Sequence, residues 1–210
     1  MPSSQEGLAR LVARGAVSDR VVAAFRSVRR EDFVPRASRS VAYTDRPVGL
    51  PRSQTTSQPS LIAMMIEAAA VGPEDRVLEI GAGYGFQTAL LAQLAAEVVA
   101  VERHEELGAE AAANLRRVGI ENAVVHVGDG WHGWPESAPY AAIVVSAAAD
   151  EVPEALGDQL VEGGRLVIPV RSGGSDDVWL LGKEEGALRR IRLVSPARFV
   201  PLVRETPSGG

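Results

Sequence analysis

Three glycines, Gly81, Gly83 and Gly85, stand at alternate positions after Glu79 and a short apolar run. Glycine allows a tight turn and lets a ligand approach the backbone closely. The dinucleotide-binding fingerprint would need a further glycine where the chain has Phe86. An acid just before the loop disfavours a diphosphate and favours a cationic ligand with an amino group. Taken alone, this spacing is also typical of a simple turn.

Two further acids follow the next two apolar segments. Glu102 stands where a carboxylate can accept hydrogen bonds from both hydroxyl groups of a ribose. Asp129, in the sequence Gly-Asp-Gly, stands where a carboxylate can accept a hydrogen bond from the amino group of adenine. Because the carboxyl ends of parallel strands meet at one edge of a sheet, we expect one crevice to contain the glycine loop and all these acids. A nucleoside with a positively charged tail fits it, and S-adenosylmethionine is such a molecule.

Several methyl acceptors are excluded by what the chain lacks. The chain has no cysteine, so it cannot use the nucleophile of a cytosine-carbon methylase. Residues 146–149 read Ser-Ala-Ala-Ala, where an amino-directed base methylase would carry Asn/Asp-Pro-Pro-aromatic. We expect no metal, because the three histidines lack ligand spacing and the acidic pair at 150–151 suits a helix start.

The composition sets the class of protein. A chain of 210 residues with 46% hydrophobic residues is long enough for one domain with a substantial core. The net charge of −5 gives no bulk attraction to nucleic acid or to anionic lipid. No apolar stretch has the length of a membrane span, and the first ten residues do not resemble a signal peptide. We therefore expect a soluble, cytoplasmic monomer with no nucleic-acid or membrane partner.

Apolar strands alternate with helices through the middle of the chain, which favours a parallel sheet covered on both faces. The expected strands are 77–80, 98–101, 123–127, 140–145 and 165–170, and the expected helices are 87–95, 105–117 and 152–160. Gly163 and Gly164 are expected to close the last helix. Segments 178–181 and 188–193 should form an antiparallel pair, with Gly182 and Gly186 in the turn between them.

The N-terminal part should form a cover over the crevice. Residues 18–30 have helical spacing with Ser18 as the cap, and Pro59 suits the first position of another helix. Residues 33–58 read as a long ordered loop and are the best candidate for a mobile part. We therefore expect one domain with three parts: a cap (1–71), a nucleoside-binding core (72–170), and C-terminal strands with a tail (171–210).

The chain resembles the protein-L-isoaspartate O-methyltransferases along almost its whole length. Matching motifs include Phe-Val-Pro at 33–35, Gln-Thr-Thr-Ser-Gln-Pro at 54–59, the glycine loop, Val-Glu-Arg at 101–103, Gly-Asp-Gly at 128–130 and Phe-Val-Pro-Leu at 199–202. The segment 54–59 is far more specific than the glycine loop, which many methyltransferases share. The resemblance implies a doubly wound, mostly parallel, Rossmann-like α/β fold with an N-terminal helical cap and C-terminal antiparallel strands.

The resemblance also implies roles for individual residues. It places Ser57 beside the transferring methyl group and the substrate carboxylate, with Val200 and Pro201 holding the peptide. The implied substrate-binding residues are Thr55, Thr56, Gln58, Val200 and Pro201, and the implied cofactor-binding residues are Glu79, Gly81, Gly83, Gly85, Glu102, Arg103, Asp129 and Gly130. From the residues alone, the favoured interpretation of Ser57 is a cap for the helix after Pro59, and only the resemblance favours the site role.

The implied reaction is esterification of the α-carboxyl group of L-isoaspartyl residues in damaged proteins or peptides, with S-adenosyl-L-homocysteine as the other product. The ester then cyclises to a succinimide without enzyme. A carboxylate is already ionised at neutral pH, so no general base is needed. One departure from the family is Pro-Arg-Ser at 51–53, where a glycine-rich approach is usual. It leaves open a specialised peptide or small-molecule carboxylate as acceptor, and a non-catalytic binding protein is the third alternative.

Overall fold

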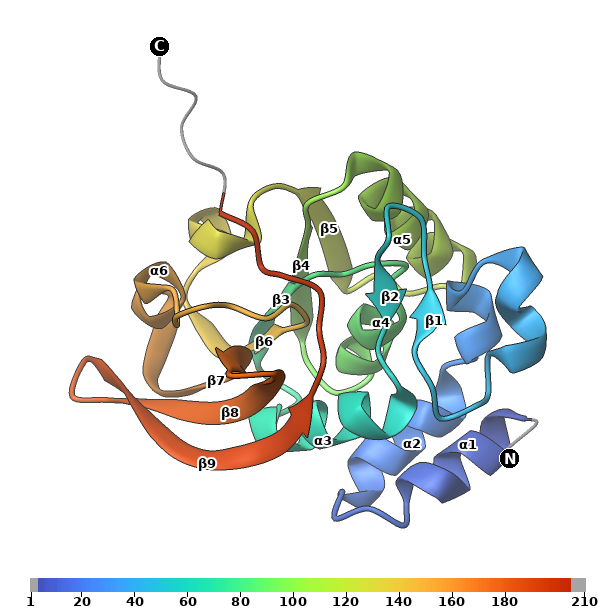
Figure 1. Ribbon diagram of the computed structural model, residues 1–210, viewed down its shortest axis with the longest axis horizontal. Helices are drawn as coiled ribbons and strands as arrows, with labels where there is room; N and C mark the ends of the chain where they lie inside the picture. Colours follow the sequence, from blue (N-terminus) through green and yellow to red (C-terminus); the bar gives the residue numbers. More distant parts are fainter. Residues whose placement is uncertain (1–3, 205–210) are drawn as a thin grey trace.

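The computed structural model describes residues 4–204 and is built on one seven-stranded sheet (Figure 1). The strand order is β5-β4-β3-β6-β7-β8-β9. The bounds are β3 Arg76–Ile80, β4 Glu97–Glu102, β5 Ala123–Val127, β6 Tyr140–Val145, β7 Leu160–Ser172, β8 Ser175–Glu184 and β9 Ala187–Ala197. The tail expected at the C-terminus lies outside the described residues.

The pairing of the strands confirms the predicted fold class. Strands β5, β4, β3, β6 and β7 pair in parallel, whereas β8 and β9 are added in antiparallel fashion. The parallel strands are apolar because both faces of the sheet are covered. The chain order reverses at β3, which lies between β4 and β6, and the crevice of an open sheet is found at such a point.

Helices cover the two faces unequally. On one face, α3 (Pro59–Ala69), α4 (Phe86–Ala92) and part of α5 (Glu105–Arg117) share a hydrophobic core with alternate residues of the sheet. On the other face, the short helix α6 (Glu154–Asp158) and the 3-10 helices η3 (Gly130–His132) and η4 (Pro135–Ser137) adjoin a second core. The alternation of side chains along each strand divides its residues between these two cores.

The N-terminal part packs onto the first core. Helices α1 (Gln5–Val12) and α2 (Asp19–Ser27) join the same hydrophobic cluster as α3 and the sheet. Helix α1 was not expected from the sequence. The expectation that Ser18 caps α2 by its side chain is wrong, since its hydroxyl and amide both donate to Glu67 Oε2 at 2.8 Å.

The segment expected to be one long loop contains short regular elements. It includes the end of the 3-10 helix η1 (Arg30–Phe33), the 3-10 helix η2 (Arg36–Val41), and the strands β1 (Val48–Gly49) and β2 (Thr55–Thr56), which pair as a hairpin. Elements this short leave no clear periodicity in a sequence. The hairpin lies over the carboxyl ends of the central strands in Figure 1.

Two glycine assignments near the C-terminus are also wrong. Gly163 and Gly164 lie inside β7 rather than after a helix, and Gly182 lies inside β8. The turn before β9 instead contains Glu185 and Gly186, with φ angles of 53° and 78°. A glycine inside a strand often marks close packing, and a Cβ on Gly182 would lie 3.0 Å from Ile191. No helix within residues 4–204 is long and apolar enough to cross a bilayer.

Candidate active site

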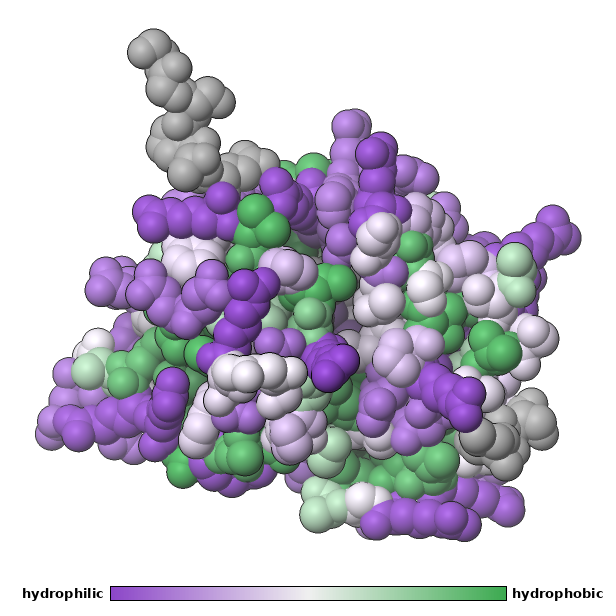
Figure 2. Space-filling model, in the orientation of Figure 1, coloured by the Kyte–Doolittle hydropathy of each residue, from purple (hydrophilic) through white to green (hydrophobic). Residues whose placement is uncertain are grey.

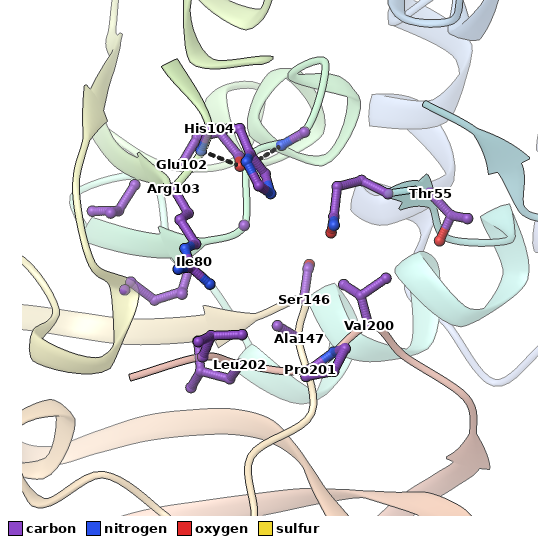
Figure 3. Close-up of a pocket in the computed structure, with 16 residues that line it drawn as sticks. Thr55, Ile80, Glu102, Arg103, His104, Ser146, Ala147, Val200, Pro201 and Leu202 are labelled. Atoms are coloured by element: carbon purple, nitrogen blue, oxygen red, sulfur yellow. Dashed lines mark hydrogen bonds between the residues drawn. The ribbon is translucent and has the colours of Figure 1, made fainter. Parts of the chain in front are cut away.

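A cavity opens at the carboxyl ends of β3, β4 and β6, and we call it the main cavity. Figure 2 shows a hollow in the middle of this face, with apolar surface on its walls and hydrophilic residues around it. Residues from strand ends, the β1–β2 hairpin and the stretch after β9 line it (Figure 3): Gln54, Thr55, Ile80, Gly81, Gly83, Val101, Glu102, Arg103, His104, Gly130, Ser146, Ala147, Val200, Pro201, Leu202 and Val203.

The glycine loop forms the floor of this cavity. Gly81 and Gly83 line it with φ angles of 89° and 57°, in the left-handed region where glycine is favoured. The amide of Gly81 donates to Val101 O at 2.8 Å, which ties the loop to the next strand. Gly85 lies outside the lining, where it precedes α4 and packs against Ala111. Two of the three glycines therefore face a ligand, and the third shapes the start of the helix.

Glu102 has the geometry of a ribose-binding carboxylate. Oε2 accepts the amide of Gly83 at 2.8 Å, and Oε1 accepts the amide of His104 at 3.0 Å. Only 5% of the residue is exposed. Each carboxylate oxygen can accept a second hydrogen bond, so both can receive a hydroxyl group from the cavity. This donor and acceptor set fits the ribose of S-adenosylmethionine. Arg103 also lines the cavity (Figure 3).

Gly130 and Asp129 are placed differently. Gly130 lines the cavity, and a Cβ there would lie only 2.3 Å from Ile80 Cγ2, so a larger residue would force Ile80 to shift. Asp129 does not line the cavity. Its Oδ1 accepts the amide of Trp131 at 2.9 Å and caps η3. The structure therefore brings Gly130, but not the Asp129 side chain, to the cavity wall.

A smaller side cavity adjoins the main cavity and contains Ser57. The two cavities share Thr55, Gly81, Gly83 and Ser146 in their walls. The side cavity is further lined by Phe33, Thr56, Ser57, Ile62, Glu79, Ala82, Tyr84, Phe86 and Gln87. Ser57 thus faces a cavity that shares four wall residues with the cavity faced by Glu102. Gln58 lines neither cavity; it precedes α3, and its Nε2 donates to Ser60 Oγ at 3.1 Å.

Ser57 does not cap α3. The residue at the cap position is Gln58, which makes no side-chain capping bond, and the free amide of Ser60 donates instead to Asp45 Oδ1 at 2.9 Å. Asp45 comes from the loop before the hairpin, so the helix start is satisfied by a distant residue. The capping interpretation of Ser57 is therefore removed, whereas its role beside the methyl acceptor stays a prediction.

Glu79 is buried, with 0% of the residue exposed, and lines the side cavity. Gln87 Nε2 donates to Glu79 Oε1 at 3.0 Å, and the hydroxyl of Thr88 donates to Oε2. Burial is the main cause that raises the pKa of Glu79 to about 7, against the lowering effect of these two hydrogen bonds. Gln87 also donates to Ser146 Oγ at 2.9 Å. Glu79 is therefore connected by hydrogen bonds, through Gln87, to Ser146 in the wall of both cavities.

The stretch after β9 completes the wall of the main cavity. Ala148 N donates to Val200 O at 2.8 Å, and Leu202 N donates to Ala148 O at 2.7 Å, which fixes Val200 and Pro201 beside the end of β6. The lining residues that sequence analysis missed include six that the site description uses or that border it: Gln54, Ile80, His104, Ser146, Gln87 and Leu202. Ser146 directly follows β6, and the expectation that ligand-binding residues follow the carboxyl ends of parallel strands would have identified it. Among residues 4–204, no cluster of His, Asp or Glu side chains is arranged to hold a metal ion.

Comparisons with known proteins agree with this geometry. A model of the family described as Protein-L-isoaspartate(D-aspartate) O-methyltransferase matches residues 3–207. A protein-L-isoaspartate O-methyltransferase of Methanoculleus marisnigri is 49% identical over 191 residues, which are 91% of this chain and 86% of the relative.

Solved structures show the same fold. One of a protein-L-isoaspartate O-methyltransferase superposes with a TM-score of 0.85 at 32% identity, covering 98% of this chain and 66% of that one. A protein of Plasmodium falciparum in complex with S-adenosyl-L-homocysteine has the same TM-score at 23% identity, covering 97% of this chain and 100% of the other.

Proposed function

The chain belongs to the protein-L-isoaspartate(D-aspartate) O-methyltransferase family, and from this premise we propose that it methylates the α-carboxylate of L-isoaspartyl residues in damaged proteins or peptides. S-adenosylmethionine, when bound, supplies an electrophilic methyl group on a sulfonium. The observation that carries the proposal is a pair of adjoining cavities with shared walls: Glu102 lines the main cavity and Ser57 lines the side cavity. The methyl ester then forms a succinimide without enzyme, and hydrolysis returns part of it to aspartate.

We assign the two ends of this pair of cavities to the two substrates. Glu102 holds the ribose through oxygens that still have accepting capacity, while Gly81 and Gly83 allow close approach to the backbone. Gly130 leaves room for Ile80 in the cavity wall. Ser57 donates its hydroxyl to the acceptor carboxylate, and Val200 and Pro201 hold the peptide beside it. The assigned cofactor is S-adenosyl-L-methionine, and no metal has a part in this assignment.

The chemistry required of the protein is alignment rather than proton removal. The acceptor carboxylate has a pKa of about 4 and is ionised at neutral pH, so the site needs no general base. What the residues contribute is orientation of the reacting atoms and exclusion of water. The β1–β2 hairpin and the stretch after β9 cover the main cavity from two sides. The proposed working form is a monomer that acts in the cytoplasm.

A pair of peptides tests this function. An isoaspartyl peptide and its normal aspartyl twin are incubated with radiolabelled S-adenosylmethionine, and base-labile methyl esters are counted. We expect label on the isoaspartyl peptide alone. Label on the aspartyl twin would favour a specialised carboxylate methyltransferase. Label on neither, with S-adenosylhomocysteine still bound in calorimetry, would favour a non-catalytic binding protein.

A further inference from the structure

Arg30 is buried inside the cap, close to the acceptor end of the site. It is 0% exposed, and no other Arg or Lys among the described residues 4–204 is classed as buried. Nη1 donates to the carbonyl oxygens of Ala42 and Thr44, both at 3.0 Å. Nη2 donates to those of Arg46 at 3.1 Å and Ser57 at 3.0 Å. One side chain thus ties η1 to the loop before β1 and to the residue at the proposed methyl acceptor.

Burying a charged guanidinium costs free energy, which argues against a role in core packing alone. Burial lowers the pKa of Arg30 to about 10, so the group still carries its charge at neutral pH without a carboxylate in direct contact. Its Nε is buried with no hydrogen-bond partner. The guanidinium lies over the ring of Phe86 at 5.6 Å. An apolar side chain of similar volume would fill the same space with a smaller desolvation free energy. We therefore attribute the role of Arg30 to its N–H groups, which bind the backbone carbonyl oxygens.

The bonds of Arg30 act on Ser57 together with those of Asp45. The carbonyl of Ser57 is held by Arg30, and the amide of Ser60, three residues later, is held by Asp45. The loop that carries Asp45 is itself bound to Arg30 through Thr44 and Arg46. Because a peptide unit is planar, holding the carbonyl of Ser57 and the start of α3 fixes the position of the Ser57 Cα, from which its side chain projects, and restricts its backbone.

We propose that Arg30 is a positioning residue for the methyl acceptor: its four bonds to carbonyl oxygens hold the Ser57 hydroxyl in the side cavity. The inference rests on the proposed role of Ser57 in carboxylate methylation. It assigns to a buried cation in the cap a task that spacing along the sequence does not reveal.

Arg20 supplies a matched control. It also donates to two backbone carbonyls across the cap, those of Val71 at 3.0 Å and Leu94 at 3.2 Å. These carbonyls lie outside both cavities. Arg20→Met therefore removes the same kind of bond without touching Ser57. Arg30→Met removes the donors, and Arg30→Lys keeps the charge but replaces the planar fork with one ammonium group, which cannot reproduce bonds from two separate nitrogens.

The first arm of the test measures hydrogen exchange of the full-length proteins at a temperature where all are folded. We expect Arg30→Met to speed exchange in peptides covering residues 42–60 by about tenfold or more, with Arg30→Lys in between, and the sheet unchanged. Arg20→Met should leave these peptides as they are. Unchanged exchange of residues 42–60 in Arg30→Met would overturn the inference, whatever the activity of the enzyme.

The second arm is a double-mutant cycle on kcat with the isoaspartyl peptide. We expect Arg30→Met to lower kcat about tenfold, with Kd for S-adenosylhomocysteine unchanged in calorimetry. In the Ser57→Ala background the same change should cost almost nothing further, because the residue acts through Ser57. Effects that multiply would show a merely structural role. A wild-type enzyme inactive on the peptide would instead refute the proposed function, and the exchange arm would still decide the placement of Ser57.

Discussion

The two ends of the active site are built in different ways. At the cofactor end, Gly81 and Gly83 lie in the loop after β3 and Glu102 is the last residue of β4, and hydrogen bonds between these neighbouring strand ends hold them. At the acceptor end, Ser57 comes from a segment with little regular structure. Polar side chains from elsewhere in the cap, Arg30 and Asp45, hold its backbone.

This difference separates the two halves of the reaction physically. The cofactor end inherits its geometry from the pairing of parallel strands, so it tolerates changes in the cap. The acceptor end depends on a few bonds between distant residues, so its shape can change without disturbing the nucleoside site. The tip of the β1–β2 hairpin illustrates this freedom, because an exposed ion pair, Arg52 with Glu106 at 3.3 Å, connects it to α5.

The largest expected effect is a pH dependence of stability at the cofactor end, which contains the buried acid Glu79. The acceptor end is held by Arg30, which stays charged at neutral pH and so adds no such dependence. The folded pKa of Glu79 is about 7, above its ordinary value of 4.5. Its contribution to stability is therefore fully present below pH 4.5 and is lost as the pH rises through about 7. We expect the free energy of unfolding of the wild type, relative to Glu79→Gln, to fall by about 3 kcal/mol over this range.

Urea unfolding of the ligand-free proteins at acid and at neutral pH measures this effect. Comparing the two proteins at each pH removes the contribution of every other titrating group that they share. Parallel pH profiles for wild type and Glu79→Gln would show that Glu79 has an ordinary pKa, and that the cofactor end is as insensitive to pH as the acceptor end.

The second prediction separates binding from turnover at the cofactor end. Glu102→Ala should raise Kd for S-adenosylhomocysteine about 100-fold, because it removes charge-assisted bonds to the ribose. At saturating cofactor, kcat should change little. Calorimetry gives Kd, and Glu102→Gln, which keeps the shape but loses the charge, should fall between. A Kd that stays the same while kcat falls would place Glu102 at the wrong end of the site.

The third prediction is the converse at the acceptor end. Ser57→Ala should lower kcat for the isoaspartyl peptide about tenfold, because one hydrogen bond to a charged group is lost, while Kd for S-adenosylhomocysteine stays the same. Ser60→Ala is the control, since Ser60 lies nearby in α3 and lines neither cavity. If Ser57→Ala weakens both quantities equally, the two ends are not separable in the way the geometry indicates.

The smallest expected effect concerns the tip of the hairpin. Arg52 and Ser53 have φ angles of 59° and 56°, and the amide of Gln54 closes the turn on Pro51 O at 3.2 Å. Two successive left-handed residues suit glycine and strain other side chains. This geometry gives a physical reason for the glycine-rich approach that the family usually has at this point.

Ser53→Gly should therefore raise the free energy of unfolding by about 0.5 kcal/mol, the relief of strain slightly exceeding the entropy cost of glycine. Ser38→Gly is the matched control in the same part of the chain. It lies in η2, outside the positive-φ residues, and should lower stability by about 0.5 kcal/mol. Urea unfolding measures both. A loss of stability in Ser53→Gly as large as that in Ser38→Gly would mean that the turn is not strained.

The sequence by itself determined most of the cofactor end. Alternating apolar strands and helices predicted the parallel sheet, and the strands at 123–127 and 140–145 and the helix at 105–117 have the predicted bounds. The glycine loop and Glu102 were found because the loop directly follows one strand and Glu102 ends the next. Neighbouring parallel strands end at the same edge, so residues far apart in the chain meet there by rule.

Only the tertiary structure decided the acceptor end. Spacing could not tell whether Ser57 caps α3, because the answer depends on Asp45 taking the free amide of Ser60. It also gave no sign of Arg30, whose four carbonyl partners are spread from residue 42 to residue 57. Backbone carbonyls are alike in every residue, so a side chain that binds them leaves no pattern of residue types. Such contacts exist only once the chain has folded around the buried charge.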